Sequence, residues 1–199
     1  MQTAISSICN VVDLTAHRHL RLALISDTHG AVSPDVLAQV RNSDAVLHAG
    51  DIMGGDVIRS LAPRLGVVVS VLGNNDFSAT WKDRDHDLLN SLRETAIVRC
   101  AGGDIAIEHG HRVPRIEVDH SPLADKYHDR RMVVFGHTHI QRADMESEPW
   151  LINPGAAGFT RNKGGASCSV LTIKGDCWRI EEFKFTANKK AGEGIECFC

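Results

Sequence analysis

The stretch Leu22-Ala23-Leu24-Ile25-Ser26-Asp27-Thr28-His29-Gly30 is an apolar run that ends in a carboxylate and an imidazole two residues apart. Such a run predicts a buried β-strand over residues 20–26. Because side chains alternate along a strand, Asp27 and His29 would lie on one side of the chain where it surfaces. Open α/β sheets bind ligands at the carboxyl ends of their strands. The stretch alone leaves two interpretations open, metal ligands or ordinary turn residues.

Two more apolar runs in the first half also end in polar residues. Residues 45–49 end at Gly50-Asp51, and residues 67–72 end at Gly73-Asn74-Asn75-Asp76. Between the first two runs, Ser33-Pro34-Asp35 predicts the start of a helix, and a second helix is expected over residues 56–61. The resulting strand–helix–strand–helix–strand order predicts parallel pairing with right-handed crossovers. A single polar strand end is easily explained by ordinary turn residues, but three such ends are harder to explain in that way.

The sequence of the second half of the chain predicts shorter helices and strands and two hairpins. Helices are expected over residues 83–93 and 121–130, strands over 132–135 and 150–153, and hairpins over 96–108 and 168–183. The first hairpin ends in His109-Gly110-His111, and the strand over 132–135 ends in Gly136-His137-Thr138-His139. We expect one domain over residues 20–186, with an N-terminal extension over 1–19 and a C-terminal tail over 187–199.

Composition excludes several classes of protein. The chain of 199 residues has a formal net charge of −3, which gives no basic surface for nucleic acid, so no nucleic-acid partner is expected. It has no 18-residue apolar run, and we expect no membrane span and no signal peptide. The six cysteines have no metal-finger spacing, so we expect reduced thiols and a cytoplasmic protein. The sequence leaves homo-oligomer formation open.

The side chains at the strand ends form a set of candidate metal ligands. Their carboxylate, amide and imidazole groups suit Mn, Fe, Zn or Ni better than Ca or Mg. The set is too large for one four-coordinate zinc and fits two metals that share a carboxylate. Two such metals clamp the oxygens of an in-line displacement at phosphorus, which points to phosphoester hydrolysis. The candidates are Asp27, His29, Asp51, Asn74, His109, His137 and His139.

Five blocks of the sequence, in this order, resemble the signature of the calcineurin-like metallophosphoesterase superfamily. They are Asp27-Thr28-His29, Gly50-Asp51, Gly73-Asn74-Asn75-Asp76, His109-Gly110-His111 and Gly136-His137-Thr138-His139. Asn153-Pro154-Gly155 resembles a segment of the small, single-domain phosphodiesterase branch. The resemblance implies an α/β fold with two facing mixed β-sheets flanked by helices, a four-layer αββα sandwich.

The resemblance also implies a role for each candidate ligand. Asp27, His29 and His139 would hold the first metal, and Asn74, His109 and His137 the second. Asp51 would bridge the two ions, with Mn²⁺ the first expectation and Fe, Zn or Ni as alternatives. A metal-bridging hydroxide would attack phosphorus in line, making the protein a phosphoric ester hydrolase for a small phosphorylated substrate. A phosphodiester is expected in preference to a monoester.

The sequence departs from the family pattern beside the second metal. Many members carry a histidine where this chain has Asn75, and an amide can donate a hydrogen bond but cannot supply a proton. Asn75 and His111 are our candidates for contacting the phosphoryl group and protonating the leaving group. The Gly-Asp block lacks the Asp-Arg-Gly of protein Ser/Thr phosphatases, which argues against a phosphoprotein substrate. Ala156 stands where a serine is common.

Other residues have competing interpretations. His48 fits a hydrogen-bonded core position, Asp76 fits a residue that orients a neighbouring side chain, and Trp81 fits packing better than a substrate mouth. A set of arginines flanks the candidate site in sequence, and one of them is a candidate phosphate contact: Arg112, Arg115, Arg130 and Arg131. As an alternative function, the fold also serves as a non-catalytic protein-binding scaffold in the retromer coat, in a related subunit that has lost metal ligands.

Overall fold

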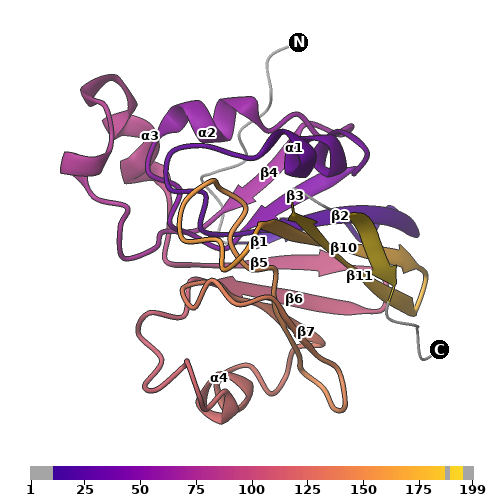
Figure 1. Cartoon of the computed structure of the whole chain (residues 1–199). Helices are drawn as coiled ribbons and strands as arrows, with labels where there is room; N and C mark the ends of the chain where they lie inside the picture. The colour runs from indigo at the N-terminus through magenta and orange to yellow at the C-terminus, as the bar shows by residue number, and fades with distance from the viewer. Residues whose placement is uncertain (1–10, 187–188, 195–199) are drawn as a thin grey trace.

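The computed structural model describes residues 11–186 and 189–194, which form two six-stranded sheets packed face to face (Figure 1). The first sheet has the strand order β12-β11-β10-β2-β3-β4. Its strands are β2 (His19–Ile25), β3 (Ala45–His48), β4 (Val67–Ser70), β10 (Ala166–Lys174), β11 (Cys177–Thr186) and β12 (Lys189–Gly194). The pairs β2–β3 and β3–β4 are parallel, as the strand–helix–strand order predicts. Their carboxyl ends therefore meet at one edge of the sheet.

The second sheet has the order β1-β5-β6-β7-β9-β8. Its strands are β1 (Val11–Asp13), β5 (Thr95–Cys100), β6 (Gly103–Glu108), β7 (Met132–Val134), β8 (Arg142–Asp144) and β9 (Trp150–Asn153). The hairpin β5–β6 is antiparallel, while β6, β7 and β9 run parallel to one another. The carboxyl ends of β6 and β7 consequently point to one side and carry the histidine-containing blocks.

Helices cover the outer face of each sheet, which completes the four layers (Figure 1). Helices α1 (Pro34–Arg41), α2 (Gly55–Ser60) and α3 (His86–Ser91) flank the first sheet, and α4 (Ser121–Lys126) lies against the second. The inter-sheet core includes Leu22, Leu47 and Ile107, all fully buried. Burial of that kind is the main stabilising contribution in such a sandwich. The predicted two-sheet α/β fold is confirmed.

Several element boundaries differ from the predictions for local reasons. The helix expected over 83–93 divides into a 3-10 turn (Asp83–Asp85) and α3, because Asp85 turns its buried carboxylate to Arg59, 2.9 Å away. The helix expected over 121–130 ends at Lys126, because the Tyr127 side chain is buried and donates its hydroxyl hydrogen bond to Glu108. In both cases the regular helix is interrupted beside a side chain that has a tertiary partner.

The structure also adds strands outside the expected elements. The predicted extension over residues 1–19 includes β1, which pairs in parallel with β5 and buries Val12 and Leu14 in the inter-sheet core. Within the part of the chain that the structure describes, β12 likewise pairs with β11 inside the predicted tail. Residues 1–10, 187–188 and 195–199 lie outside the described part, so those portions of the two predicted segments stay predictions.

The expectation of reduced thiols is confirmed for two cysteines and wrong for a third. Cys100 and Cys168 are free and buried. Burial raises the pKa of each thiol to about 12, so both stay protonated and unreactive near neutral pH. Cys177 is disulfide-bonded, so the expectation of reduced thiols is wrong there. Among the helices described, none is long and apolar enough to cross a bilayer.

Candidate metal centre

The candidate ligands leave their strands in a backbone conformation that L-residues rarely adopt. Five of the seven predicted ligands have positive φ: Asp27 (52°), His29 (45°), Asp51 (56°), His137 (69°) and His139 (58°). Left-handed backbone costs a non-glycine residue of the order of 1–2 kcal/mol and persists only where the surroundings impose it. Strain of this kind clusters at functional sites, and here it gathers at one edge of the molecule.

The first group of ligands surrounds one point. One ligand atom each from Asp27, His29, Asp51 and His139 lies within 4.8 Å of all the others, a group able to hold a metal ion. His139 Nε2 lies 3.2 Å from Asp27 Oδ1, and His29 Nε2 lies 3.8 Å from Asp51 Oδ2. Asp27 is fully buried, and its Oδ1 has no hydrogen-bond donor. A buried carboxylate oxygen without a donor requires a cation for compensation.

The second group lies on the other side of Asp51. His109 Nε2 is 3.4 Å from Asp51 Oδ1 and 3.1 Å from Asn74 Oδ1. His137 Nδ1 is 3.0 Å from the same Asn74 oxygen. The two groups therefore share Asp51, which stands between His29 and His109. This grouping parallels the division implied by the resemblance, and the individual metal roles stay a prediction.

Hydrogen bonds to backbone carbonyls fix which imidazole nitrogens face the centre. His109 Nδ1 donates to the carbonyl oxygen of Ala49 at 2.8 Å, and His139 Nδ1 donates to that of Arg161 at 2.9 Å. In the neutral rings the Nε2 lone pairs then face Asp51 and Asp27, whose oxygens are also acceptors. Lone pairs that converge in this way repel one another unless a cation lies between them. The donor set therefore fits a divalent metal.

The pKa shifts of the candidate ligands also indicate a site for a cation. Burial lowers the pKa of His109, but the hydrogen bond with Asp51 and the charge of Asp27 outweigh it and raise the pKa overall. The close approach of Asp27, whose Oδ1 lies 3.2 Å from His139 Nε2, is the main cause of the raised pKa of His139. Burial would raise the pKa of Asp51, yet hydrogen bonds from His109 and Asn75 hold it well below its usual range. The centre therefore favours anionic carboxylates and attracts positive charge.

Asn75 holds the shared carboxylate. Its backbone N–H donates to Asp51 Oδ1 at 2.8 Å, and its side-chain amide donates to Asp51 Oδ2 at 2.7 Å. The amide thus orients Asp51, and its second N–H is still able to donate, so the expected contact with a phosphoryl group stays a prediction. His111, our candidate acid, lies beside His109 with ring centroids 5.5 Å apart. Burial lowers the pKa of His111, which leaves its ring neutral near pH 7.

Asp76 orients a neighbouring side chain, as predicted, and also holds three backbone groups. Its carboxylate accepts hydrogen bonds from the backbone N–H groups of Ile52 (3.0 Å), Met53 (2.8 Å) and Gly73 (2.9 Å). It also accepts from the indole N–H of Trp81 at 3.1 Å. Asp76 thus ties together the loops after β3 and β4, and Trp81 is a buried packing residue, as predicted.

His48 is a fully buried core residue, as predicted. Its Nε2 lies 3.0 Å from the hydroxyl of Thr28, and burial lowers its pKa to about 4.

Three of the four arginines considered as phosphate contacts are engaged elsewhere. Arg112 pairs with Glu94, Arg130 pairs with Asp104, and Arg131 donates to the carbonyl of Gly102 and stacks on Trp178.

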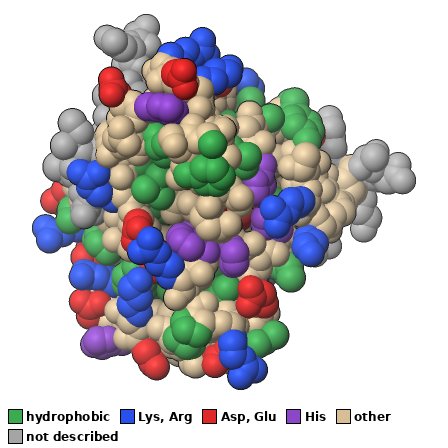
Figure 2. All heavy atoms as spheres, turned by 90° about the vertical axis from the view of Figure 1, so that its left-hand side faces the viewer, with side chains coloured by type: hydrophobic (Ala, Val, Ile, Leu, Met, Phe, Trp, Pro, Cys, Tyr) green, Lys and Arg blue, Asp and Glu red, His purple; other side chains and the backbone are tan. Residues whose placement is uncertain are grey.

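The sequence analysis did not single out Arg161 and Lys163, which line a pocket together with His137, Thr138 and His139. A sequence signal was present: both cations follow Asn153-Pro154-Gly155 within a loop bounded by glycines. Asn153 itself anchors the histidine loop, because its side-chain amide donates to the carbonyl of Gly136 at 2.8 Å. Figure 2 shows histidine side chains gathered on this face, with Lys and Arg side chains beside them.

Gly136 packs against Ser26 and Asp27 with no space for a side chain, and Gly136→Ala tests this close contact. A Cβ there would lie 1.9 Å from Ser26 Oγ and 2.8 Å from Asp27 Oδ2. We expect a loss of about 1–3 kcal/mol in the free energy of unfolding, measured by urea denaturation, and weaker metal binding. Gly136→Ala combined with Ser26→Ala removes the worst clash and should recover part of the loss. Wild-type stability in the single variant would contradict this packing.

A family model, the calcineurin-like phosphoesterase superfamily domain, matches residues 20–176. The chain belongs to this family. Among curated relatives, a Bacillus subtilis protein named a probable metallophosphoesterase is 22% identical over 178 residues, covering 85% of this chain and 94% of the relative. A phosphodiesterase of Methanocaldococcus jannaschii is 25% identical over 146 residues, covering 68% of this chain and 83% of the relative.

Solved structures of similar shape include vacuolar protein sorting 29 of Cryptosporidium parvum. It superposes with a TM-score of 0.74 at 19% identity and covers 90% of this chain and 98% of its own. At that identity the likeness shows the shared fold alone. The fold thus matches proteins named as enzymes and a protein named for vacuolar sorting, so the site must decide the function.

Proposed function

We propose that the protein is a metal-dependent phosphodiesterase that acts on a small phosphorylated substrate. The observation that carries the proposal is the buried Asp27 Oδ1 without a donor, which faces the Nε2 lone pair of His139, a ring that the Arg161 carbonyl holds in place. Family membership adds the reaction class, and the phosphodiesterase relative favours diesters. Two divalent ions, with Mn²⁺ as the first choice, would lower the pKa of a water and neutralise charge at phosphorus.

Different residues of the chain would bind the metal ions, fix the imidazole tautomers and position Asp51. Asp27, His29 and His139 would hold one ion, and Asn74, His109 and His137 the other. The Arg161 and Ala49 carbonyls keep the imidazoles in the tautomer whose Nε2 can coordinate. Asn75 holds Asp51 in place with two hydrogen bonds, one from its backbone N–H and one from its side-chain amide. Because an amide supplies no proton, the enzyme should favour substrates with good leaving groups.

The test is hydrolysis of bis-p-nitrophenyl phosphate by protein supplemented with Mn²⁺. We expect turnover that disappears with a chelator, returns with Mn²⁺, and exceeds turnover of p-nitrophenyl phosphate. Asp51→Asn should lose at least about a hundredfold in kcat/KM, since it removes charge shared by both ligand groups. Asp125→Asn, an exposed carboxylate on α4, is the matched control and should behave as wild type. Equal activity in Asp51→Asn would overturn the proposal.

The alternative is a non-catalytic scaffold of the same fold, and one observation favours it. Asn75 stands where many family members carry a histidine, so no proton donor occupies that position beside the second group. A scaffold of this kind would bind Mn²⁺ by calorimetry yet give no turnover above Asp51→Asn with any phosphoester. The activity assay and the calorimetry together discriminate the two functions.

A further inference from the structure

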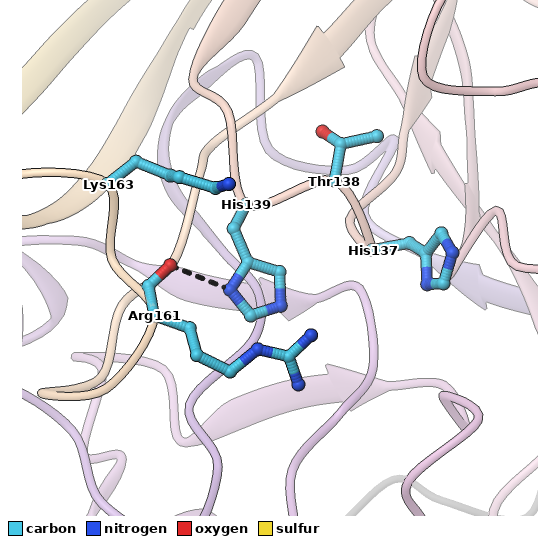
Figure 3. Close-up of a pocket in the computed structure, with 5 residues that line it drawn as sticks. All are labelled: His137, Thr138, His139, Arg161 and Lys163. Carbon is cyan, nitrogen blue, oxygen red and sulfur yellow. Dashed lines mark hydrogen bonds between the residues drawn. The ribbon is translucent and has the colours of Figure 1, made fainter.

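A pocket of about 240 Å³ opens beside the metal centre, and two cationic side chains line it (Figure 3). Both lie on the loop between β9 and β10, while the other lining residues, His137, Thr138 and His139, follow β7. Small-molecule sites usually measure about 300–1,000 Å³, so this pocket has room for one charged group of a ligand rather than for a whole ligand.

The loop that carries Arg161 and Lys163 is held in place. Asn162 donates to the carbonyl of Gly158 at 3.2 Å, and Lys184 Nζ donates to the carbonyl of Lys163 at 3.0 Å. Arg161 and Lys163 have φ values of 58° and 47°, which L-residues adopt only when their surroundings impose them. The Arg161 carbonyl accepts from His139, which couples the loop directly to the metal centre. These contacts fix the backbone of the loop, and with it the direction in which the Arg161 and Lys163 side chains leave the loop.

The two cations have no partner among the described residues. Within residues 11–186, the Arg161 guanidinium and the Lys163 ammonium make no ion pair and no side-chain hydrogen bond. By contrast, Arg112 pairs with Glu94 and Lys126 pairs with Glu108. In Figure 3 the two side chains extend on either side of the His139 ring. Two unpaired cations that share one small pocket are suited to an anion with several oxygens.

Charge balance indicates which anion they would take. Two divalent ions carry four positive charges, of which Asp27 and Asp51 neutralise two, and the scissile group of a diester carries one negative charge. The metal centre alone therefore suffices for the scissile phosphate. We propose that Arg161 and Lys163 bind a second phosphate of the substrate, so that the enzyme prefers phosphodiesters that also carry a phosphomonoester. This inference rests on the proposed function.

The test uses two diesters that share a scissile bond and leaving group. One is thymidine 5′-(p-nitrophenyl phosphate), and the other carries an added 3′-phosphate. In Mn²⁺-supplemented wild type, kcat/KM should be about ten- to a hundredfold higher for the phosphorylated diester. In Arg161→Gln combined with Lys163→Gln, the ratio should fall to about one. Lys174→Gln, an exposed cation at the far end of β10, is the matched control and should keep the wild-type ratio.

Binding provides a readout that does not depend on turnover. Calorimetry should show thymidine 3′,5′-bisphosphate binding about tenfold or more tightly than thymidine 5′-phosphate, with the difference lost in the double variant. If wild type hydrolyses both diesters with equal kcat/KM, this inference is wrong and the proposed function stands. A double variant that slows both diesters equally also overturns it, because the cations would then bind the scissile phosphate. If nothing is hydrolysed, the proposed function fails and calorimetry alone decides the inference.

Discussion

Replacing Asp51 with alanine is expected to abolish tight binding of both metal ions, whereas Asp27→Ala should remove only one. Asp51 stands between His29 Nε2, 3.8 Å away, and His109 Nε2, 3.4 Å away, so both ligand groups depend on it. The Asp27 carboxylate lies with the first group, 3.2 Å from His139 Nε2, and contacts the second group only through the backbone N–H of His137. Loss of an outer partner of a metal ligand already costs about 10–100-fold in affinity, so loss of a shared ligand should cost more.

The asymmetry is measured by Mn²⁺ titration calorimetry and by metal analysis after dialysis. Wild type should hold two Mn²⁺ per chain, Asp27→Ala one, and Asp51→Ala none at the same free Mn²⁺. Because both variants remove a buried carboxylate, each serves as the control for the other's effect on folding. Equal stoichiometry in Asp27→Ala and Asp51→Ala would show that Asp51 is not shared, and the two-ion arrangement would then be wrong.

The strand ends were the part of the site most open to prediction from sequence. Asp27, Asp51 and Asn74 each follow a continuous apolar run, and parallel pairing brings the ends of such runs together. The positive φ of Asp27 and Asp51 could not be foreseen, because it arises from contacts across strands. The backbone N–H of Asp27, for example, donates to the carbonyl of Gly50 at 3.0 Å. Apolar periodicity predicts where a strand ends but not the backbone conformation of the residues that follow it.

What the sequence could not supply depends on distant partners. The four flanking arginines looked alike as candidates, and only the fold shows that Glu94 and Asp104 engage two of them. The position of Arg161 after Asn153-Pro154-Gly155 did not indicate its partner, yet the fold places its carbonyl on His139, a residue 22 positions earlier. The strand β1 was missed because three residues give too short a period to recognise. Long-range contacts decide these features, and local patterns do not record them.

Asp76→Ala should cause the largest loss of folding stability outside the metal ligands. Its carboxylate accepts hydrogen bonds from three backbone N–H groups and the Trp81 indole, all within the loops that present Asp51 and Asn74. Hydrogen bonds to a charged acceptor each contribute about 1.5–3 kcal/mol, and orphaned buried donors add a desolvation cost. After partial rehydration of these loops, we expect about 3–5 kcal/mol lost from the free energy of unfolding by urea denaturation.

Asp76→Asn distinguishes the carboxylate's charge from its shape. An amide keeps the volume but replaces one acceptor oxygen with a donor, which would face N–H groups that also donate. It should therefore lose stability too, by less than Asp76→Ala, while Asp83→Asn, an exposed carboxylate in the following 3-10 turn, should change nothing. Metal affinity should fall in both Asp76 variants, because Ile52 and Met53 directly follow Asp51 and fix its backbone. A stable Asp76→Asn with wild-type Mn²⁺ affinity would show that the loops hold the centre without this carboxylate.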